Sequence, residues 1–206
     1  MSIKNKIKSN PKLKSIIHFL LIPRNQARPR LWVKYFVNPF IHHKGRGAKV
    51  RRRTRMDILP FNKFSIGENS TIEDFSTINN GVGDVIIGYG TRIGMSNVII
   101  GPVKVGNNVI LAQNIVLSGL NHRYEDINIP PRLQKVTVSP IVVEDDVWIG
   151  ANAMIAAGVT VGKHSVVAGG SVVTKNILPF SVVAGNPAKL LKKYNFETNK
   201  WERTNN

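Results

Sequence analysis

Five histidines are the chain's candidates for acid–base chemistry, because a neutral imidazole with an ordinary pKa near 6.5 accepts a proton at about neutral pH. His18, His42 and His43 lie in a basic N-terminal segment, and His164 lies at a corner of a repeating pattern. His122 lies where that pattern gives way to an aperiodic polar stretch. Because loops on a rigid scaffold tend to carry chemistry, His122 is the candidate general base. On the residues alone, the alternative is an ordinary polar residue at a loop root.

The pattern around His122 has a period of six residues and runs from Ile66 to Leu178. A branched aliphatic residue fills the first position of fifteen hexads, and Gly or Ala follows it in nine of them. Six residues hold three two-residue strand repeats, so alternate side chains keep their facing, and small residues permit a corner in each hexad. The first positions are Ile66, Ile72, Ile78, Ile87, Ile93, Ile99, Val105, Leu111, Leu117, Val143, Ile149, Ile155, Val161, Val167 and Val173.

Such hexads predict an all-β fold, a parallel β-helix in which each coil buries the aliphatic residues of its neighbours. Three hexads per triangular coil predict about five coils. An α-helix is excluded because six is not a multiple of 3.6 and each glycine would cost about 1 kcal/mol. A β-sandwich is the structural alternative, but its turns should come about every 8–12 residues.

Two interruptions divide the repeat. At residues 80–84 its phase shifts by three, which predicts a small bulge or turn. Residues 123–139 are polar, contain Pro130-Pro131 and have no period, so they predict a projecting loop whose root is His122.

The charge is concentrated at the N-terminus. The net charge is +17, and residues 1–55 hold 16 of the 29 Lys and Arg residues and no acid. Residues 16–22 are too short an apolar run to span a bilayer, which needs about 20 residues. No signal-peptide cleavage site follows them, so we expect a basic arm that caps the first coil and contacts an anionic membrane surface. A solvated arm, or a helix packed on the prism, is the alternative for this segment.

Other function classes are disfavoured by composition. No cysteine is present, which excludes disulfides and a cysteine nucleophile. Bases interleaved with aromatic residues at positions 24–56 come with no nucleic-acid recognition motif, so no nucleic acid is expected. A catalytic zinc needs about three protein ligands, whereas the repeat holds only His122 and His164, so no metal is expected.

Residues 64–193 resemble the hexapeptide-repeat acyltransferases, close to the galactoside and maltose O-acetyltransferases and those of polysaccharide biosynthesis. The resemblance is carried by Ile141 to Gly150, by Val173-Thr174-Lys175 and by Gly185-Asn186-Pro187-Ala188-Lys189. It implies a left-handed β-helix. We expect a basic, partly helical arm at 1–63, the β-helix at 64–185 and a short C-terminal tail or helix at 186–206.

The resemblance also implies a site. His122, sixteen residues after Gly106, falls where the family's catalytic histidine lies. Asn97, or Met95 in its place, and Trp148 would contact the sugar acceptor. The alternatives are an asparagine ladder inside a corner for Asn97 and a packing role at a corner for Trp148. Glu125, Asp126 or a backbone carbonyl would orient the imidazole. The residues expected to hold acetyl-CoA are Ala151, Gly169, Thr174 and Lys175 along the pantetheine arm, with Lys189 and Lys192 at the phosphates.

The expected function is O-acetylation of a sugar hydroxyl by direct transfer from acetyl-CoA, in bacterial surface polysaccharide biosynthesis. The family implies a homotrimer and a cytoplasmic enzyme, which the basic arm could hold at the inner membrane face near a lipid-linked acceptor. The alternatives are a non-catalytic scaffold that binds through its arm, and a metal enzyme like the γ-carbonic anhydrases.

Overall fold

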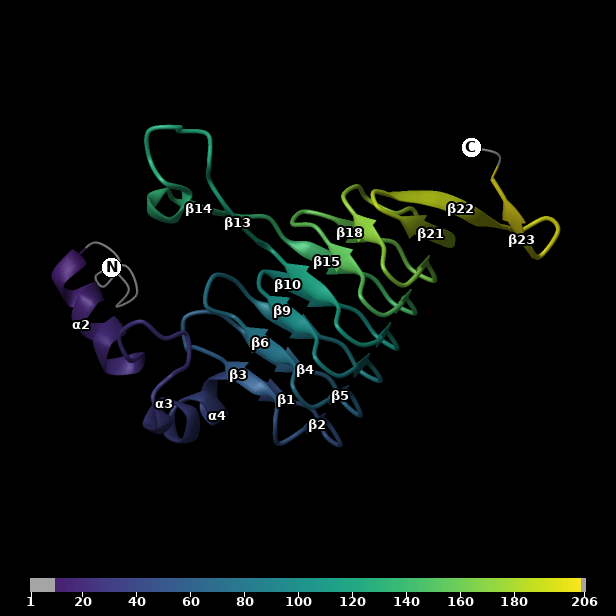
Figure 1. The fold of residues 1–206 in the computed structure, drawn as a ribbon. Coiled ribbons are helices and arrows are strands. Elements are labelled where there is room, and N and C mark those ends of the chain that lie inside the picture. Colours follow the sequence, from purple (N-terminus) through teal and green to yellow (C-terminus); the bar gives the residue numbers. More distant parts are fainter. Residues whose placement is uncertain (1–9, 205–206) are drawn as a thin grey trace.

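A computed structural model describes residues 10–204, which wind into a three-sided prism of parallel strands with appendages at both ends (Figure 1). The prism has six complete coils, numbered 1 to 6: residues 43–57, 64–79, 85–100, 103–118, 141–155 and 160–173. Each coil gives one strand to each of three sheets, named A, B and C in chain order. The chain therefore turns at three edges per coil, called AB, BC and CA.

The strands are short. Sheet A contains β1 (His43–Lys44), β4 (Phe64–Ile66), β7 (Val85–Ile87), β10 (Val103–Val105), β15 (Ile141–Val143) and β18 (Thr160–Val161). Sheet B contains β2 (Lys49–Val50), β5 (Thr71–Ile72), β8 (Arg92–Ile93), β11 (Ile110–Leu111), β16 (Trp148–Ile149), β19 (Val166–Val167) and β21 (Ser181–Gly185). Sheet C contains β3 (Arg55–Asp57), β6 (Thr77–Asn79), β9 (Val98–Ile100), β12 (Val116–Ser118), β17 (Met154–Ile155) and β20 (Val172–Val173).

The first-position aliphatic residues form the core. All fifteen are buried, and the parallel ladders pair each with its counterpart one coil away, as Ile72 pairs with Ile93. Each coil thus covers the apolar face of the next, and removal of this area from water is the main force that stacks them. The predicted parallel β-helix is confirmed.

The prism starts one coil earlier than predicted. Lys44, Val50 and Met56 of coil 1 pair with Ile66, Ile72 and Ile78. They keep the spacing of six, but only Val50 is a branched aliphatic residue. The hexad pattern therefore does not identify this coil, which lies within the segment expected to be the arm. The count is therefore six complete coils instead of about five.

The edges are tight because their residues adopt unusual backbone conformations. Along edge AB the third corner residue has a positive φ in six successive coils: Gly47, Asn69, Gly90, Asn108, Asp146 and His164. Gly and Asn tolerate this region best. At Gly67, the first residue of one of these corners, an added Cβ would lie 2.5 Å from the backbone of the next coil, so only glycine fits.

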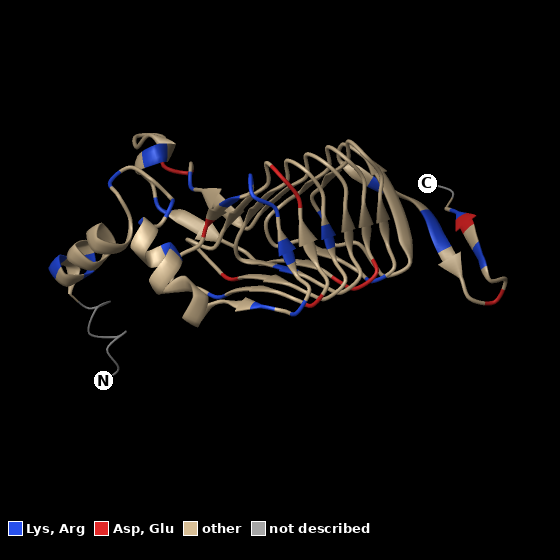
Figure 2. Cartoon of the chain, turned by 90° about the horizontal axis from the view of Figure 1, so that it is seen from below, with Lys and Arg blue, Asp and Glu red and all other residues tan. Residues whose placement is uncertain are grey.

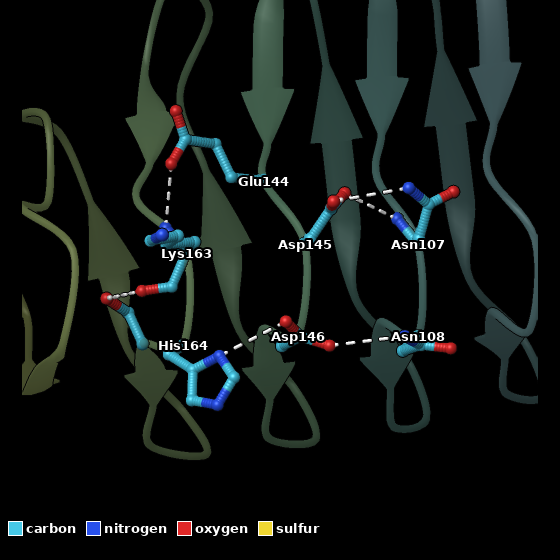
Figure 3. A network of polar contacts seen from close by, with 8 residues as sticks. Asn107, Asn108, Glu144, Asp145, Asp146, Lys163 and His164 are labelled. Carbon is cyan, nitrogen blue, oxygen red and sulfur yellow. Dashed lines mark hydrogen bonds and ion pairs between the residues drawn. The ribbon is translucent and has the colours of Figure 1, made fainter.

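Polar side chains also link successive coils at edge AB (Figure 3). Asp145 accepts hydrogen bonds from the backbone N–H and side-chain amide of Asn107, at 2.8 and 3.2 Å. Asn108 donates to Asp146 at 3.3 Å, and Nδ1 of His164 lies 3.2 Å from the other oxygen of Asp146. His164 is therefore held in an edge ladder.

The predicted turn at 80–84 is present. Asn80 is buried there, and its side chain accepts a 2.7 Å hydrogen bond from the N–H of Leu59 and donates to the carbonyls of Leu59 and Asn62. These bonds tie together the CA connections of the first two coils.

Within residues 10–204, three helices precede the prism: α2 (Pro11–Leu21), α3 (Leu31–Phe36) and α4 (Asn38–Ile41). Val33 of α3 is fully buried, and the Asn38 side chain donates a 2.8 Å hydrogen bond to the Ile58 carbonyl, so α3 and α4 are anchored beside coil 1. The partly helical arm is confirmed. No helix in the described part of the chain has both the length and the apolar character needed to cross a membrane.

The C-terminal expectation is wrong. Instead of a tail or helix, the chain forms β22 (Ala188–Asn195) and β23 (Lys200–Arg203), antiparallel to each other. β22 also pairs antiparallel with β21 and so extends sheet B. The alternating burial of Ala188 to Lys193 against exposed neighbours is a strand pattern, which the high lysine content obscured.

Candidate functional site

His122 ends one strand of a hairpin that leaves the prism at edge CA after coil 4. The hairpin consists of β13 (Leu120–His122), the 3₁₀-helix η1 (Pro131–Leu133) and β14 (Val136–Val138), and it projects outward on the same side as the N-terminal helices (Figure 1). The predicted loop is therefore ordered at its root, where His122 lies opposite Val136.

The imidazole of His122 is exposed, and it makes no hydrogen bond or ion pair to any residue between 10 and 204. A general base needs a free lone pair within reach of the proton that it removes. Both ring nitrogens of His122 are open to a substrate, whereas His164 already contacts Asp146.

The acidic residues of the hairpin do not orient His122. Glu125 accepts a 3.0 Å hydrogen bond from the backbone of Tyr124, and Asp126 accepts a 2.9 Å bond from the backbone of Asn128. Hydrogen bonds from the backbone at Glu125 and Tyr124, with the nearby charge of Arg123, hold the pKa of the Glu125 carboxyl below its usual value. Both carboxylates therefore form hydrogen bonds with the backbone of their own loop and not with His122.

Asn97, expected to bind the acceptor, is a structural residue. It is fully buried at edge BC of coil 3. Its side-chain nitrogen donates to the carbonyls of Gly94 and Ala112 at 2.9 and 2.8 Å, and its oxygen accepts from Ile115. No polar atom of this amide is left for a ligand.

Trp148 is 52% exposed on the outer face of sheet B, in coil 5, between the register partners Ile110 and Val166. Sheet B lies opposite edge CA, from which His122 projects, because the chain passes through sheets A, B and C in turn. One chain therefore does not bring Trp148 and His122 together.

Ala151 and Gly169 occupy equivalent corners of edge BC in coils 5 and 6. The N–H of Gly170 donates a 2.8 Å hydrogen bond to the Ala151 carbonyl, and a Cβ added at Gly169 would lie 3.0 Å from that oxygen. The edge is thus a smooth column of backbone, against which the long pantetheine chain of a coenzyme could lie.

The same edge continues into the C-terminal hairpin. Gly185 donates to the Ser171 hydroxyl at 3.2 Å, and Lys189 pairs with Ala184, so Lys189 lies near the end of edge BC. Lys192 pairs with Val182, farther along sheet B. Neither lysine has an ion-pair partner among residues 10–204, so both can meet phosphates.

Thr174 and Lys175 lie at a different edge. Both are exposed at edge CA, directly after β20 of coil 6. Lys175 lines a hollow of about 280 Å³ at the end of the prism, with Ile177, Val183, Leu190 and Lys193. Of the six predicted coenzyme residues, Ala151, Gly169 and Lys189 therefore lie along edge BC, Lys192 lies on sheet B, and Thr174 and Lys175 lie at edge CA.

No group of three or more His, Asp or Glu side chains in the described residues is arranged to hold a metal ion. His122 stands apart from His164, which lies at edge AB. Nothing in this geometry supports the metal-enzyme alternative.

Two family models match the chain. Residues 140–175 match the model described as bacterial transferase hexapeptide (six repeats), and residues 84–118 match the hexapeptide repeat of succinyl-transferase. Both stretches lie within the prism.

One curated relative is a putative lipopolysaccharide biosynthesis O-acetyl transferase, WbbJ, of Escherichia coli strain K12. It is 35% identical over 108 residues, which cover 49% of this chain and 55% of WbbJ. The chain thus spans about half the length of this relative.

Solved structures share the fold. A variant of AntD, an N-acyltransferase from Bacillus cereus in complex with dTDP-4-amino-4,6-dideoxyglucose and coenzyme A, has a TM-score of 0.65 at 19% identity, over 76% of this chain and 86% of that one. The acetyltransferase VCA0836 of Vibrio cholerae O1 biovar eltor, in complex with acetyl-CoA, has a TM-score of 0.55 at 22% identity, over 94% and 98%. At these identities the likeness concerns the fold alone.

Proposed function

Because residues 140–175 match the bacterial transferase hexapeptide model and residues 84–118 match the hexapeptide repeat of succinyl-transferase, we propose that this protein is an acetyl-CoA-dependent O-acetyltransferase acting on a sugar hydroxyl. The observation that carries the proposal is His122, an exposed and unengaged imidazole at the root of a hairpin on a hexapeptide prism. The similarity to WbbJ supports an ester-forming role in surface polysaccharide biosynthesis.

The proposed chemistry is direct transfer. A ring nitrogen of His122 takes the proton of the acceptor hydroxyl, and the oxygen attacks the thioester carbonyl of acetyl-CoA to form a new C–O bond. Backbone N–H groups near the thioester stabilise the oxyanion. The C–S bond then breaks, the imidazolium returns the proton to the sulfur, and CoA leaves with no acyl-enzyme formed.

We propose that the coenzyme binds along edge BC. The pantetheine arm would lie along the column of backbone at Ala151 and Gly169, and the phosphates of the coenzyme would reach Lys189. Lys192, Thr174 and Lys175 lie farther from this column and would contact the coenzyme only where it leaves the edge.

The complete site requires more than one copy of the chain. His122 leaves edge CA, whereas Trp148 and the coenzyme column lie on sheet B and edge BC. A homotrimer with parallel prisms would set edge CA of one subunit against edge BC of the next. Light scattering tests this: a mass near three times 22.9 kDa supports the trimer, and a monomeric mass at assay concentration contradicts it.

The helical arm is the proposed contact with the inner face of the cell membrane. Large apolar side chains are exposed on α3 and α4, and α3 also carries the cation Lys34. Figure 2 marks Lys and Arg positions in blue along the N-terminal helices and their connections. Aromatic residues flanked by cations favour the interface of an anionic bilayer. The exposed apolar residues are Leu31, Trp32, Tyr35, Phe36, Phe40 and Ile41.

The direct test is acceptor-dependent release of CoA from acetyl-CoA over a panel of free glycosides, nucleotide sugars, amino sugars and lipid-linked sugars. Formation of an acetyl ester on one class supports the proposal and identifies the acceptor. Transfer to an amine alone, as the similarity to an N-acyltransferase would suggest, would replace the O-acetyl assignment. No CoA binding in calorimetry would favour a non-catalytic scaffold.

A further inference from the structure

Edge BC of coil 1 carries three consecutive arginines, Arg51, Arg52 and Arg53, all exposed. Together with Asp74 they line a hollow of about 630 Å³. None of the three guanidinium groups forms an ion pair with a carboxylate among residues 10–204. Three cations and one acid leave this hollow with a formal charge of +2.

The backbone under these arginines is held firmly. The Thr54 N–H donates a 3.1 Å hydrogen bond to the Arg51 carbonyl, and the Arg53 N–H donates a 2.9 Å bond to Oδ1 of Asp74. The Arg53 guanidinium lies over the Phe75 ring, 5.6 Å from its centroid. Asp74 therefore holds the backbone at Arg53, while the side chains of Arg51 and Arg52 are accessible to a ligand.

The arginine corner lies on the same edge as the proposed coenzyme column. Val50 pairs with Ile72 and Arg55 with Thr77, so Arg52 and Asp74 occupy equivalent corner positions. The same position in the later coils is filled by Met95, Gln113, Ala151 and Gly169, as the hydrogen bonds between successive corners show. Four strand spacings separate Arg52 from Ala151, which is about 19 Å at 4.7–4.9 Å per coil.

Cations occur at only one of these BC corners. The corners of coils 2 to 6 contain none, and the acidic residue Glu73 of coil 2 is paired with Arg92 at 3.0 Å. The positive charge is thus placed at one end of the edge, with a largely uncharged stretch between it and Ala151.

We propose that Arg51, Arg52 and Arg53 bind the diphosphate of an activated sugar acceptor, an inference that rests on the proposed transfer function. Guanidinium groups bind phosphate oxygens in pairs of charge-assisted hydrogen bonds, and the +2 charge complements a diphosphate. His122 follows coil 4, three coils or about 14 Å from coil 1. In parallel prisms the sugar part of the acceptor, which must be longer than one ring, would extend across that gap, from its diphosphate at the arginines to the reacting hydroxyl at the imidazole of the neighbouring subunit.

The test compares two variants of the full-length protein with equal loss of charge. One replaces Arg51→Gln, Arg52→Gln and Arg53→Gln; the control replaces the exposed Arg46→Gln, Lys49→Gln and Lys63→Gln in and beside the same coil. Calorimetry measures the Kd of inorganic pyrophosphate and, separately, of CoA. We expect pyrophosphate to bind at least tenfold more weakly to the arginine variant than to the control, with CoA affinity unchanged in both.

Equal pyrophosphate affinity in both variants, or no saturable binding to the wild type, overturns the inference. Arg52→Gln alone, whose side chain forms no hydrogen bond or ion pair with the described residues, gives the same test should the triple variant unfold. If the wild-type protein does not bind CoA, that result would instead refute the proposed function. Competition by a nucleoside diphosphate sugar, compared with vesicles that contain a prenyl diphosphate sugar, separates a nucleotide from a lipid source of the diphosphate.

Discussion

The side-chain oxygen of Asn97 in coil 3 accepts a 2.6 Å hydrogen bond from the backbone N–H of Ile115 in coil 4. With two bonds from its amide nitrogen, Asn97 satisfies three backbone groups in the corners of two coils. A buried backbone group without a partner costs about 1–3 kcal/mol. Asn97 is therefore a structural link between coils.

Asn97→Ala should lower the free energy of unfolding by about 2–4 kcal/mol, because it leaves buried polar groups unpaired. Urea denaturation measures this loss, and Gln113→Ala, at an exposed corner of the same edge, is the control with little expected change. A fully stable Asn97→Ala protein with a raised acceptor KM would restore Asn97 to the acceptor site.

Stability should fall in mild acid because of His42. Its Nδ1 accepts a 3.2 Å hydrogen bond from the Phe64 N–H, so the neutral ring carries its proton on Nε2. Burial lowers the pKa of His42 from 6.5, so the unfolded state binds more protons below that pH. The free energy of unfolding should therefore decrease as pH falls through about 6.5 and level off below the folded pKa.

Thermal unfolding between pH 7.5 and 5 checks this expectation. His42→Asn keeps an acceptor near the Phe64 N–H and removes the titration, so its melting temperature should decline less with acid than that of the wild type. His43→Asn, at the exposed neighbouring position, should keep the wild-type decline. Identical acid sensitivity in the His42 variant would assign the effect elsewhere.

The coenzyme assignment predicts a binding defect without a chemical one. Lys189→Gln with Lys192→Gln removes two cations expected at the phosphates, and the KM for acetyl-CoA should rise about tenfold, or about 1.4 kcal/mol, with kcat retained. Steady-state kinetics measure both constants. Lys200→Gln, on the outer strand of the hairpin, should leave KM unchanged, and equal effects of all three lysines would indicate a diffuse charge effect.

The membrane proposal calls for substitutions instead of a deletion, because removal of residues 1–55 would destroy coil 1. Trp32→Ser, Phe36→Ser and Phe40→Ser together remove exposed apolar area without touching the buried Val33. Co-sedimentation with anionic vesicles should fall at least tenfold. Ile127→Ser and Leu133→Ser, exposed on the hairpin, are the control, and undiminished sedimentation of the arm variant would refute the contact.

The core of the fold could be predicted because the hexad period records directly which side chains face inward. The hexad pattern does not reveal coil 1, because the exposed Lys44 and the partly buried Met56 stand at the first positions in place of branched aliphatic residues. Their pairing with Ile66 and Ile78 is visible only in three dimensions. The C-terminal hairpin was missed because lysines dominate its sequence.

The site could be predicted only in part. His122 is the candidate base because it begins the break in the period, and its exposure depends on the hairpin, which the polar sequence predicts only as a loop. A corner asparagine and a ligand-binding asparagine look alike in sequence, and only the hydrogen bonds of Asn97 favour the corner alternative. The division of Ala151 and Thr174 between two edges follows from the winding of the coils, which spacing alone does not reveal.

The most direct test of the central claim is the turnover of acetyl-CoA with the acceptor found in the panel, compared between the wild type, His122→Ala and His164→Ala. His122→Ala should lower kcat by about two orders of magnitude or more, with unchanged urea unfolding, because the side chain is exposed and loses only its role as a base. His164→Ala should retain most of the activity. Near-wild-type kcat in His122→Ala would contradict the account.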